Sequence, residues 1–268
     1  MLPTISACEL LVSFSLASLG AVLAVAQQPA SAPAGATAAP RTVLVTGANR
    51  GIGLELARQY LESGWSVIAT AREPEKATEL KALGGGGKPL LVEALDVTDA
   101  KSVAALTERL KERPIDLLVN NAGVASIGNR IGDVKPDEFA HVLAVNTIGP
   151  LRVTQALLKN LRAGKGKTVV SITSVLGSIE ANGGGGFYGY RESKAALNML
   201  TRSLAAELRR DGFICIVMHP GWVQTDMGGP NAQLTPEQSV TGIRGVIAKL
   251  KPEDSGKFWA HDGTNLPW

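Results

Sequence analysis

The stretch Thr42-Val43-Leu44-Val45-Thr46-Gly47-Ala48-Asn49-Arg50-Gly51-Ile52-Gly53 decides how this chain is interpreted. Its first five residues form an apolar, β-branched run that is typical of a buried strand. Residues 54–61, after the glycines, carry apolar side chains at helical spacing. This order of strand, glycine turn and helix predicts a dinucleotide-binding unit, because glycines let the backbone approach a pyrophosphate and the helix N-terminus offers free amide donors. An ordinary strand-to-helix loop is the alternative that this stretch alone leaves open.

Strand-like segments recur along the chain and alternate with helical patterns. We expect strands near residues 42–46, 66–71, 89–94, 115–120, 167–173, 213–219 and 257–260. Such alternation predicts a parallel sheet, because crossover helices join the strands. The predicted fold class is therefore α/β: a single Rossmann-type, doubly wound domain with a mostly parallel seven-stranded sheet and helices on both faces. The glycine runs at residues 84–87 and 183–186 are expected to be mobile loops.

Tyr190 and Lys194 lie four residues apart in an alanine-rich, helix-forming run. Four residues are about one helical turn, so the phenol and the ammonium project from one face. A phenol with a pKa of about 10 is a poor acid or base at pH 7, and a nearby cation lowers that pKa. Lys194 is therefore expected to make Tyr190 a usable acid or base. Alone, the spacing is weak evidence and is more typical of a surface pair, so the neighbouring motifs decide between the two interpretations.

Five motifs follow one another in a fixed order. They are the glycine turn, Asn120-Asn121-Ala122-Gly123 after a strand-like run, Asn146, Ser174, and Tyr190 with Lys194. With the turn spaced as Gly-x-x-x-Gly-x-Gly, the chain from about Arg41 to its C-terminus resembles the short-chain dehydrogenase/reductase family. The segments 190–198, 219–223, 225–230, 262–263 and 266–268 are similar to the carbonyl-reductase branch that includes the bacterial C-factor.

The resemblance implies a role for each of four catalytic residues. Ser174 would hydrogen-bond the substrate carbonyl oxygen, and Tyr190 would act as general acid or base. Lys194 would also hold the nicotinamide ribose, and Asn146 would support a water-linked proton path. The implied cofactor-binding residues are Gly47, Asn49, Arg50, Gly51, Ile52, Gly53, Arg72, Asp96, Val97, Asn121, Ala122, Gly123, Tyr190, Lys194, Pro220, Gly221, Val223 and Thr225. Asn120 is expected to tie the sheet together rather than to touch a ligand.

The end of the second strand indicates which cofactor binds. An NAD-specific site usually places a carboxylate there for the ribose 2′-hydroxyl, but Ala69-Thr70-Ala71-Arg72 offers none. Arg72 and Arg50 suit a 2′-phosphate instead, so NADP(H) is expected; the alternative for each arginine is a solvated surface position. Asp96 with Val97 matches the family's adenine contact, although Asp96 is equally suited to capping a helix that starts near Asp99.

The expected function is NADP(H)-dependent reduction of an aldehyde or ketone by hydride transfer, with a small-molecule carbonyl or alcohol as substrate. An epimerase or dehydratase of the extended branch is a rival, but residues 191–268 leave little room for a sugar-nucleotide domain. An alternative from another class is a dinucleotide-binding signalling or regulatory protein with little physiological turnover. The interval from Ser174 to Tyr190 is about three residues longer than is usual in the family, and residues 183–186 are expected to absorb the excess. A homo-oligomer is left open.

Length and composition exclude several classes of function. Residues 41–268 suffice for one catalytic α/β domain but not for a separate substrate domain. The formal net charge is +3 and the basic residues are spread along the chain, so no nucleic-acid partner is expected. Of the two cysteines, Cys8 and Cys215, the second lies in an apolar run and is expected to be a core thiol. His141, His219 and His261 are scattered, and we predict no metal site.

Residues 1–40 have a different character. Residues 10–26 are uncharged and apolar, and an Ala/Pro-rich linker follows, so the segment is signal-like or anchor-like. Ala24-Val25-Ala26 resembles a signal-peptidase site, but the leading residues include Glu9 and lack Lys and Arg. Export, a membrane anchor and a mis-assigned start codon all stay open, whereas the supply of NADPH favours the cytoplasm.

Overall fold

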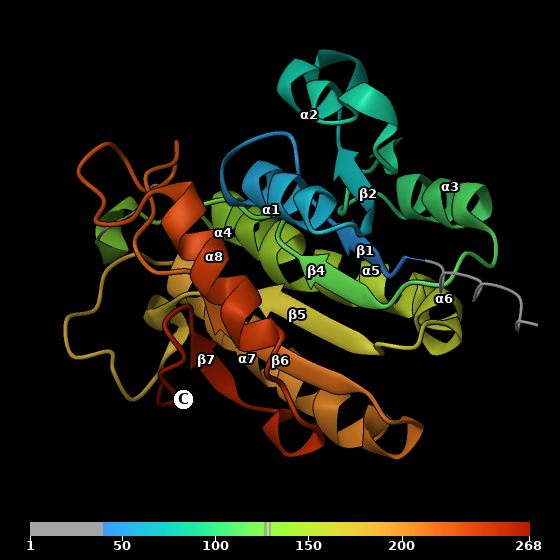
Figure 1. The fold of residues 1–268 in the computed structure, drawn as a ribbon. Helices are drawn as coiled ribbons and strands as arrows, with labels where there is room; N and C mark the ends of the chain where they lie inside the picture. The colour runs from blue at the N-terminus through green and yellow to red at the C-terminus, as the bar shows by residue number, and fades with distance from the viewer. Residues whose placement is uncertain (1–39, 126–127, 129) are drawn as a thin grey trace, which may run out of the picture. The chain divides into compact units, whose positions relative to one another are not determined.

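The computed structural model describes residues 40–125, 128 and 130–268. Within them, seven strands form one sheet in the order β3-β2-β1-β4-β5-β6-β7 (Figure 1). The strands are β1 (Thr42–Val45), β2 (Ser66–Ala71), β3 (Leu90–Ala94), β4 (Leu117–Asn120), β5 (Thr168–Ile172), β6 (Ile214–His219) and β7 (Phe258–Ala260). Every pair of neighbouring strands is parallel. The predicted α/β fold is confirmed, and each predicted strand is present.

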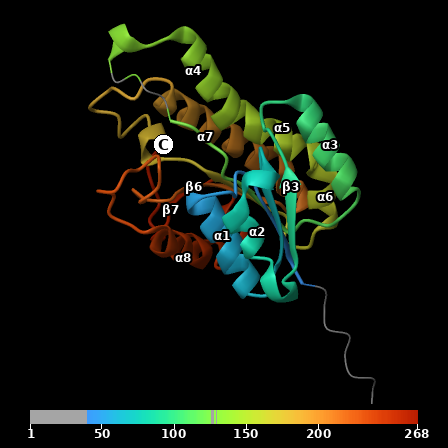
Figure 2. The same ribbon diagram turned by 90° about the horizontal axis from the view of Figure 1, so that it is seen from above.

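Helices cover both faces of the sheet (Figure 2). One face carries α1 (Gly51–Glu62), α2 (Thr78–Ala82) and α8 (Pro236–Ile247). The opposite face carries α3 (Ala100–Leu110), α5 (Gly149–Ala156), α6 (Leu158–Ala163) and α7 (Tyr190–Glu207), and α4 (Pro136–Leu143) packs beside α7. Each face has its own apolar cluster, which is why the central strands are apolar along their whole length.

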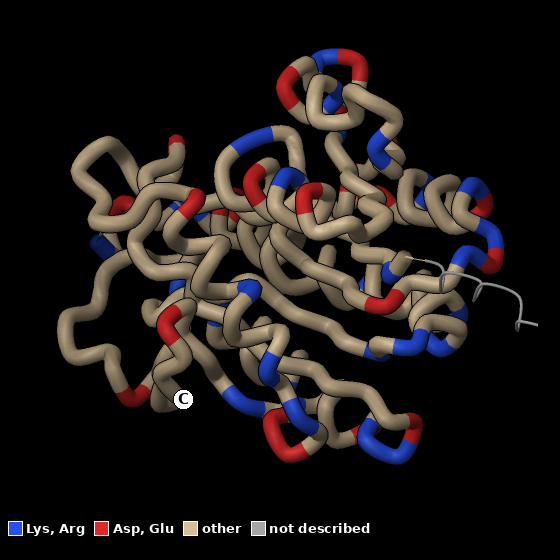
Figure 3. Tube along the Cα trace, in the orientation of Figure 1, with Lys and Arg blue, Asp and Glu red and all other residues tan. Residues whose placement is uncertain are grey.

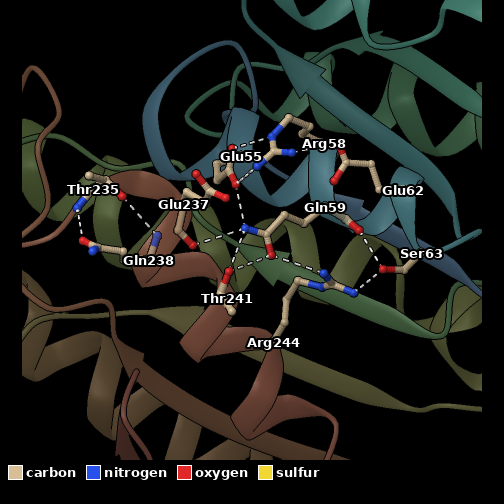
Figure 4. A network of polar contacts seen from close by, with 10 residues as sticks. All are labelled: Glu55, Arg58, Gln59, Glu62, Ser63, Thr235, Glu237, Gln238, Thr241 and Arg244. Atoms are coloured by element: carbon tan, nitrogen blue, oxygen red, sulfur yellow. Dashed lines mark hydrogen bonds and ion pairs between the residues drawn. The ribbon is translucent and has the colours of Figure 1, made fainter.

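A polar network fixes α8 against α1 (Figure 4). The buried amide of Gln59 on α1 donates to the Thr241 hydroxyl and to the Glu237 carbonyl, at 3.2 Å each. Arg244 on α8 donates in return to Gln59 Oε1 at 3.2 Å and to Ser63 Oγ at 2.5 Å. Because α8 follows the segment 222–234 directly, this network also fixes where that segment ends relative to the glycine turn at the start of α1.

The strand order reverses direction at β1 and β4, which pair with each other. In open parallel sheets, ligands bind at such a switch point, outside the carboxyl ends of the strands. Asn120 ends β4 and is buried; its amide donates to Thr154 Oγ1 on α5 at 3.1 Å. It joins the sheet to the helix layer, which agrees with the structural role expected for it.

Several sequence expectations concern regions away from this switch point. Residues 1–39, with Cys8 and the apolar segment 10–26, lie outside the described residues. Among the residues that are described, no helix is long and apolar enough to cross a membrane.

Cys215 is fully buried on β6 and burial raises its pKa to about 12, so it is the expected core thiol. Residues 85–87 form a short 3-10 turn. Lys and Arg are interleaved with Asp and Glu over many elements (Figure 3).

Candidate active site

The glycine turn between β1 and α1 has room only for glycine at its critical positions. Gly47 has a φ of 65°, and a Cβ on Gly53 would lie 2.3 Å from the Gly47 carbonyl oxygen. The Asn121 side chain, just after β4, donates to the carbonyls of Thr46 and Gly47 at 2.9 and 3.0 Å. The turn is therefore held to the neighbouring strand, and the N-terminus of α1 faces the crevice at the switch point.

This crevice contains a cavity of about 450 Å³. It is lined by thirteen of the residues that the sequence assigns to cofactor binding: Gly47, Asn49, Arg50, Gly51, Ile52, Gly53, Arg72, Asp96, Val97, Asn121, Ala122, Gly123 and Thr225. We call it the dinucleotide cavity. It is also lined by residues that sequence reasoning missed, namely Leu95, Thr98, Val124, His141, Val145, Gln224, Asp226, Met227 and Pro236.

Most charged side chains of the dinucleotide cavity are exposed, and Asp96 is partly buried. Arg50 and Arg72 are both exposed, and Arg50 forms an ion pair with Asp226 at 2.9 Å. Asp96 accepts hydrogen bonds from the backbone and hydroxyl of Thr98, which together with nearby Arg72 lower its pKa despite partial burial. The cap of α3 is Asp99, not Asp96, so the capping alternative for Asp96 is wrong.

The four catalytic candidates come from three elements that meet at the carboxyl edge of β4 and β5. Ser174 follows β5, and its hydroxyl accepts a hydrogen bond from the Leu176 amide at 3.1 Å. Tyr190 and Lys194 lie in the first turns of α7, and the Lys194 ammonium is 5.6 Å from the Tyr190 ring centroid. A hydrogen bond joins the Ser174 side chain to the Tyr190 phenol. The chain thus brings Ser174, Tyr190 and Lys194 together as the sequence predicted.

Asn146 lies in a π-helical turn, Ala144–Ile148, between α4 and α5. Such turns insert one residue into a helix and often occur at functional sites. The fully buried Asn146 amide accepts from the Val124 amide, donates to the Val124 carbonyl, and donates to Ser193 Oγ at 3.0 Å. A Cβ on Gly123 would lie 3.3 Å from Asn146 Oδ1 and 3.6 Å from Lys194 Nζ, so both side chains border the same glycine.

The electrostatics of the pair differ from the sequence expectation. Burial raises the pKa of Tyr190 and the Ser174 hydrogen bond opposes the rise, so the lowering expected from Lys194 is not observed. Lys194 is buried, donates to the Ile172 carbonyl at 2.9 Å, and has its pKa lowered to about 8 by burial. The helical spacing correctly places the two side chains on one face. The lysine ammonium, however, is held by the end of β5.

A second cavity of about 620 Å³ adjoins the first, and we call it the substrate cavity. Thr225 and Met227 line both cavities. Six residues of the predicted site line the substrate cavity: Ser174, Tyr190, Pro220, Gly221, Val223 and Thr225. Nine further lining residues were not among the individually predicted site residues: Ala125, Thr173, Val175, Leu176, Phe187, His219, Trp222, Met227 and Gly228. Asn146 and Lys194 line neither cavity, but both border Gly123, which lines the dinucleotide cavity.

The long interval between Ser174 and Tyr190 shapes one wall of the substrate cavity. Residues 183–185 are exposed and form an irregular segment, as expected for a loop that absorbs extra length; their mobility stays a prediction. Arg191 donates to the carbonyls of Gly185 and Gly186 at 3.1 Å each and fixes the end of the segment. The next residue, Phe187, lines the cavity shortly before α7 begins at Tyr190.

Two of the three histidines are neighbours, although the sequence separates them. Because β6 pairs with β7, the His261 amide donates to the His219 carbonyl at 2.9 Å. Their Nδ1 atoms are both buried without a hydrogen-bond partner among the described residues. Burial, followed by the nearby His261, lowers the pKa of His219 to about 4. The pairing of β6 with β7 creates this cluster, and no local sequence motif predicts that pairing.

Comparisons with known proteins define the class to which this fold and site belong. The sequence profile described as short chain dehydrogenase matches residues 41–234. The chain therefore belongs to the short-chain dehydrogenase/reductase family of oxidoreductases. It is 50% identical to the C-signal of Myxococcus xanthus over 155 residues, which covers 58% of this chain and 93% of that protein.

Solved structures support the same branch. The carbonyl reductase Sniffer of D. melanogaster is 35% identical, with a TM-score of 0.79 over 85% of this chain and 100% of that chain. The NADPH-bound carbonyl reductase from chicken fatty liver is 38% identical, with a TM-score of 0.80 over 85% of this chain and 99% of that chain. The predicted resemblance to the carbonyl-reductase and C-factor-like branch is confirmed.

Proposed function

We propose that this protein is an NADP(H)-dependent oxidoreductase that reduces an aldehyde or ketone, with Tyr190 as the proton donor. The observation that carries the proposal is the junction of the two cavities. The dinucleotide cavity contains the glycine turn, and the substrate cavity contains Ser174 and Tyr190. Thr225 and Met227 line both, so a dinucleotide and a small carbonyl compound can be held side by side.

The residues of the dinucleotide cavity fit NADP(H). Gly53 leaves no space for a side chain, which suits the close approach of a pyrophosphate to the N-terminus of α1. Arg50 and Arg72 supply two cations for the 2′-phosphate, and the end of β2 carries no carboxylate that would repel it. The chicken carbonyl reductase, whose structure contains NADPH, supports the same choice.

Each catalytic side chain has a role that its contacts support. When bound, NADPH supplies the hydride that reduces the carbonyl carbon. Tyr190 gives its phenolic proton to the carbonyl oxygen, and Ser174 donates a hydrogen bond to the charge that develops there. Lys194 places a cation beside the phenol at the end of β5, and its ammonium, which borders Gly123 of the dinucleotide cavity, would also bind the nicotinamide ribose. Asn146, next to Gly123 and Lys194, supports the path by which a proton returns to Tyr190.

A carbonyl panel tests this proposal. Purified protein is incubated with NADPH and simple aldehydes and ketones, and NADPH oxidation is followed at the same time as alcohol formation. We expect one alcohol for each NADPH oxidised. Calorimetric binding of NADPH without oxidation of any member of the panel would contradict the proposal.

A second candidate is a dinucleotide-binding signalling protein with little turnover. The identity of 50% to a protein named C-signal favours it. The presence of Ser174, Tyr190 and Lys194 in one site argues for retained chemistry. The same panel separates the candidates, because a binding protein would bind NADPH and leave it unoxidised.

A further inference from the structure

The substrate cavity differs from the dinucleotide cavity in its charge. Of the described residues that line it, none is Asp, Glu, Lys or Arg. Its titratable side chains are Tyr190, whose pKa is raised by burial, and His219, whose pKa is lowered to about 4. Near neutral pH both are uncharged. The dinucleotide cavity, by contrast, is lined by Arg50, Arg72, Asp96 and Asp226.

Three large apolar side chains that line the substrate cavity are about half exposed. Phe187, Trp222 and Met227 are 45%, 51% and 51% exposed, and all three line it. Exposed apolar side chains that gather around one cavity mark a binding site rather than ordinary surface. The Trp222 indole donates to the Gly228 carbonyl at 2.8 Å, so its ring is held in place.

Phe187 is held in an unfavourable backbone conformation at the catalytic edge of the cavity. Its φ of 53° is uncommon for a bulky residue, and such conformations persist where the surroundings fix them. Its carbonyl accepts from the amides of Tyr190 and Arg191 at 3.1 and 3.0 Å. The Arg191 guanidinium lies 5.8 Å from the Phe187 ring and donates to backbone carbonyls, including that of Leu176, without lining the cavity. These backbone hydrogen bonds therefore position the Phe187 ring and Tyr190 together.

We propose that the substrate cavity selects uncharged carbonyl compounds with an apolar body. The body packs against Phe187 and Trp222 while the carbonyl oxygen reaches Ser174 and Tyr190. A carboxylate, phosphate or ammonium group on that body would lose its hydration without gaining a partner of opposite charge. This inference rests on the proposed carbonyl reduction, and it adds the class of substrate that the site accepts.

Two pairs of aldehydes that differ mainly in charge provide the test, with the enzyme saturated with NADPH. The first pair is 4-tert-butylbenzaldehyde and 4-(trimethylammonio)benzaldehyde, and the second is methyl 4-formylbenzoate and 4-formylbenzoate. We expect kcat/KM to be about 100-fold higher for the neutral member of each pair, because a buried, unpaired charge is strongly disfavoured. The cationic aldehyde has the more electrophilic carbonyl, so intrinsic reactivity opposes the expected result for the first pair.

A matched pair of variants tests whether the cavity wall sets this preference. Val175 follows Ser174 and lines the substrate cavity. Val175→Asp introduces a carboxylate, and Val175→Asn introduces an uncharged group of the same shape. The readout is the ratio of kcat/KM for the cationic aldehyde to that for its neutral isostere, which cancels effects on folding or on the shared chemistry. We expect this ratio to be about 10-fold higher in Val175→Asp than in Val175→Asn.

Each outcome has one meaning. Neutral preference in both pairs, together with the change in ratio, supports the inference. Equal kcat/KM within both pairs, or preference for a charged member, overturns the inference and leaves the proposed carbonyl reduction intact. Absence of turnover with all four aldehydes, while calorimetry still detects NADPH binding, overturns the proposed function and the inference with it.

Discussion

The two cavities are built in different ways. The dinucleotide cavity depends on backbone geometry: glycines without space for a side chain, the first turn of α1 and the end of β4. The substrate cavity depends on side chains from separate loops, including residues 173–176, Phe187 and the segment 219–228. A backbone-defined site needs a short, continuous motif, whereas a side-chain-defined site tolerates many sequences. This difference explains why a short motif identifies the family, whereas no motif identifies the substrate that we propose for the second cavity.

The largest expected effect is a loss of carbonyl reduction without a loss of cofactor binding. Tyr190→Phe keeps the ring and removes the proposed acid, so carbonyl reduction should fall by about 10² to 10⁴. Dinucleotide affinity should change little, because the glycine turn and both arginines are untouched. Lys194→Met is the contrasting variant and should weaken both steps. Single-turnover reduction and calorimetry, measured on both variants, check these expectations.

Two results would contradict this separation. Near-normal turnover in Tyr190→Phe would remove the phenol from the mechanism and favour the binding-protein candidate. Loss of NADPH binding in the same variant would show that the tyrosine is structural and that the two cavities are not independent.

The second prediction concerns the dinucleotide cavity alone. A charge-assisted hydrogen bond is worth roughly 1.5 to 3 kcal/mol, so two arginine contacts with a 2′-phosphate imply a preference for NADPH of about a hundredfold or more. Replacing both Arg50 and Arg72 by Ala should bring the specificity constants for NADPH and NADH close together. The measurement is kcat/KM for each cofactor at saturating aldehyde. If the parent enzyme already uses both cofactors equally, the assignment of these arginines is wrong.

Sequence reasoning succeeded where a local pattern dictates the structure. Apolar runs placed every strand, and the glycine turn placed the dinucleotide cavity. It missed Phe187, because its place depends on the end of a loop, and Asp226, because its ion pair with Arg50 joins two distant segments. It separated His219 from His261, which only strand pairing brings together. It also predicted a lowered Tyr190 pKa from spacing, without the burial that raises it.

The third prediction concerns how the burial of His219 beside the substrate cavity makes the free energy of unfolding depend on pH. Its pKa in the native state is about 4, against an ordinary value of 6.5, so the unfolded chain binds a proton here between these pH values and the native state does not. The contribution of His219 to the free energy of unfolding is therefore fully present above pH 6.5 and is lost as the pH falls toward 4. Allowing for partial exposure, we expect this histidine to account for about 1–2 kcal/mol of lost stability between pH 7 and pH 5.

His219→Gln, which cannot titrate in this range, should reduce that loss. Urea unfolding of the parent and the variant at pH 7 and pH 5 gives the comparison. An unchanged difference between the two pH values would show that the native imidazole accepts a proton readily, and the substrate cavity would then not be uncharged in mild acid.

The smallest expected effect concerns residues outside both cavities. We expect deletion of residues 1–40 to leave folding and activity unchanged, because among the described residues the first hydrogen bonds of the sheet lie after residue 40. The Arg41 carbonyl accepts from the Ser66 amide at 2.9 Å, and the Thr42 amide donates to Asp116 Oδ2 at 2.7 Å. Deletion of residues 1–45 is the control: it removes β1, on which both halves of the sheet pair, and should abolish folding. Equal loss of activity in the two truncations would mean that the catalytic domain begins earlier than residue 41.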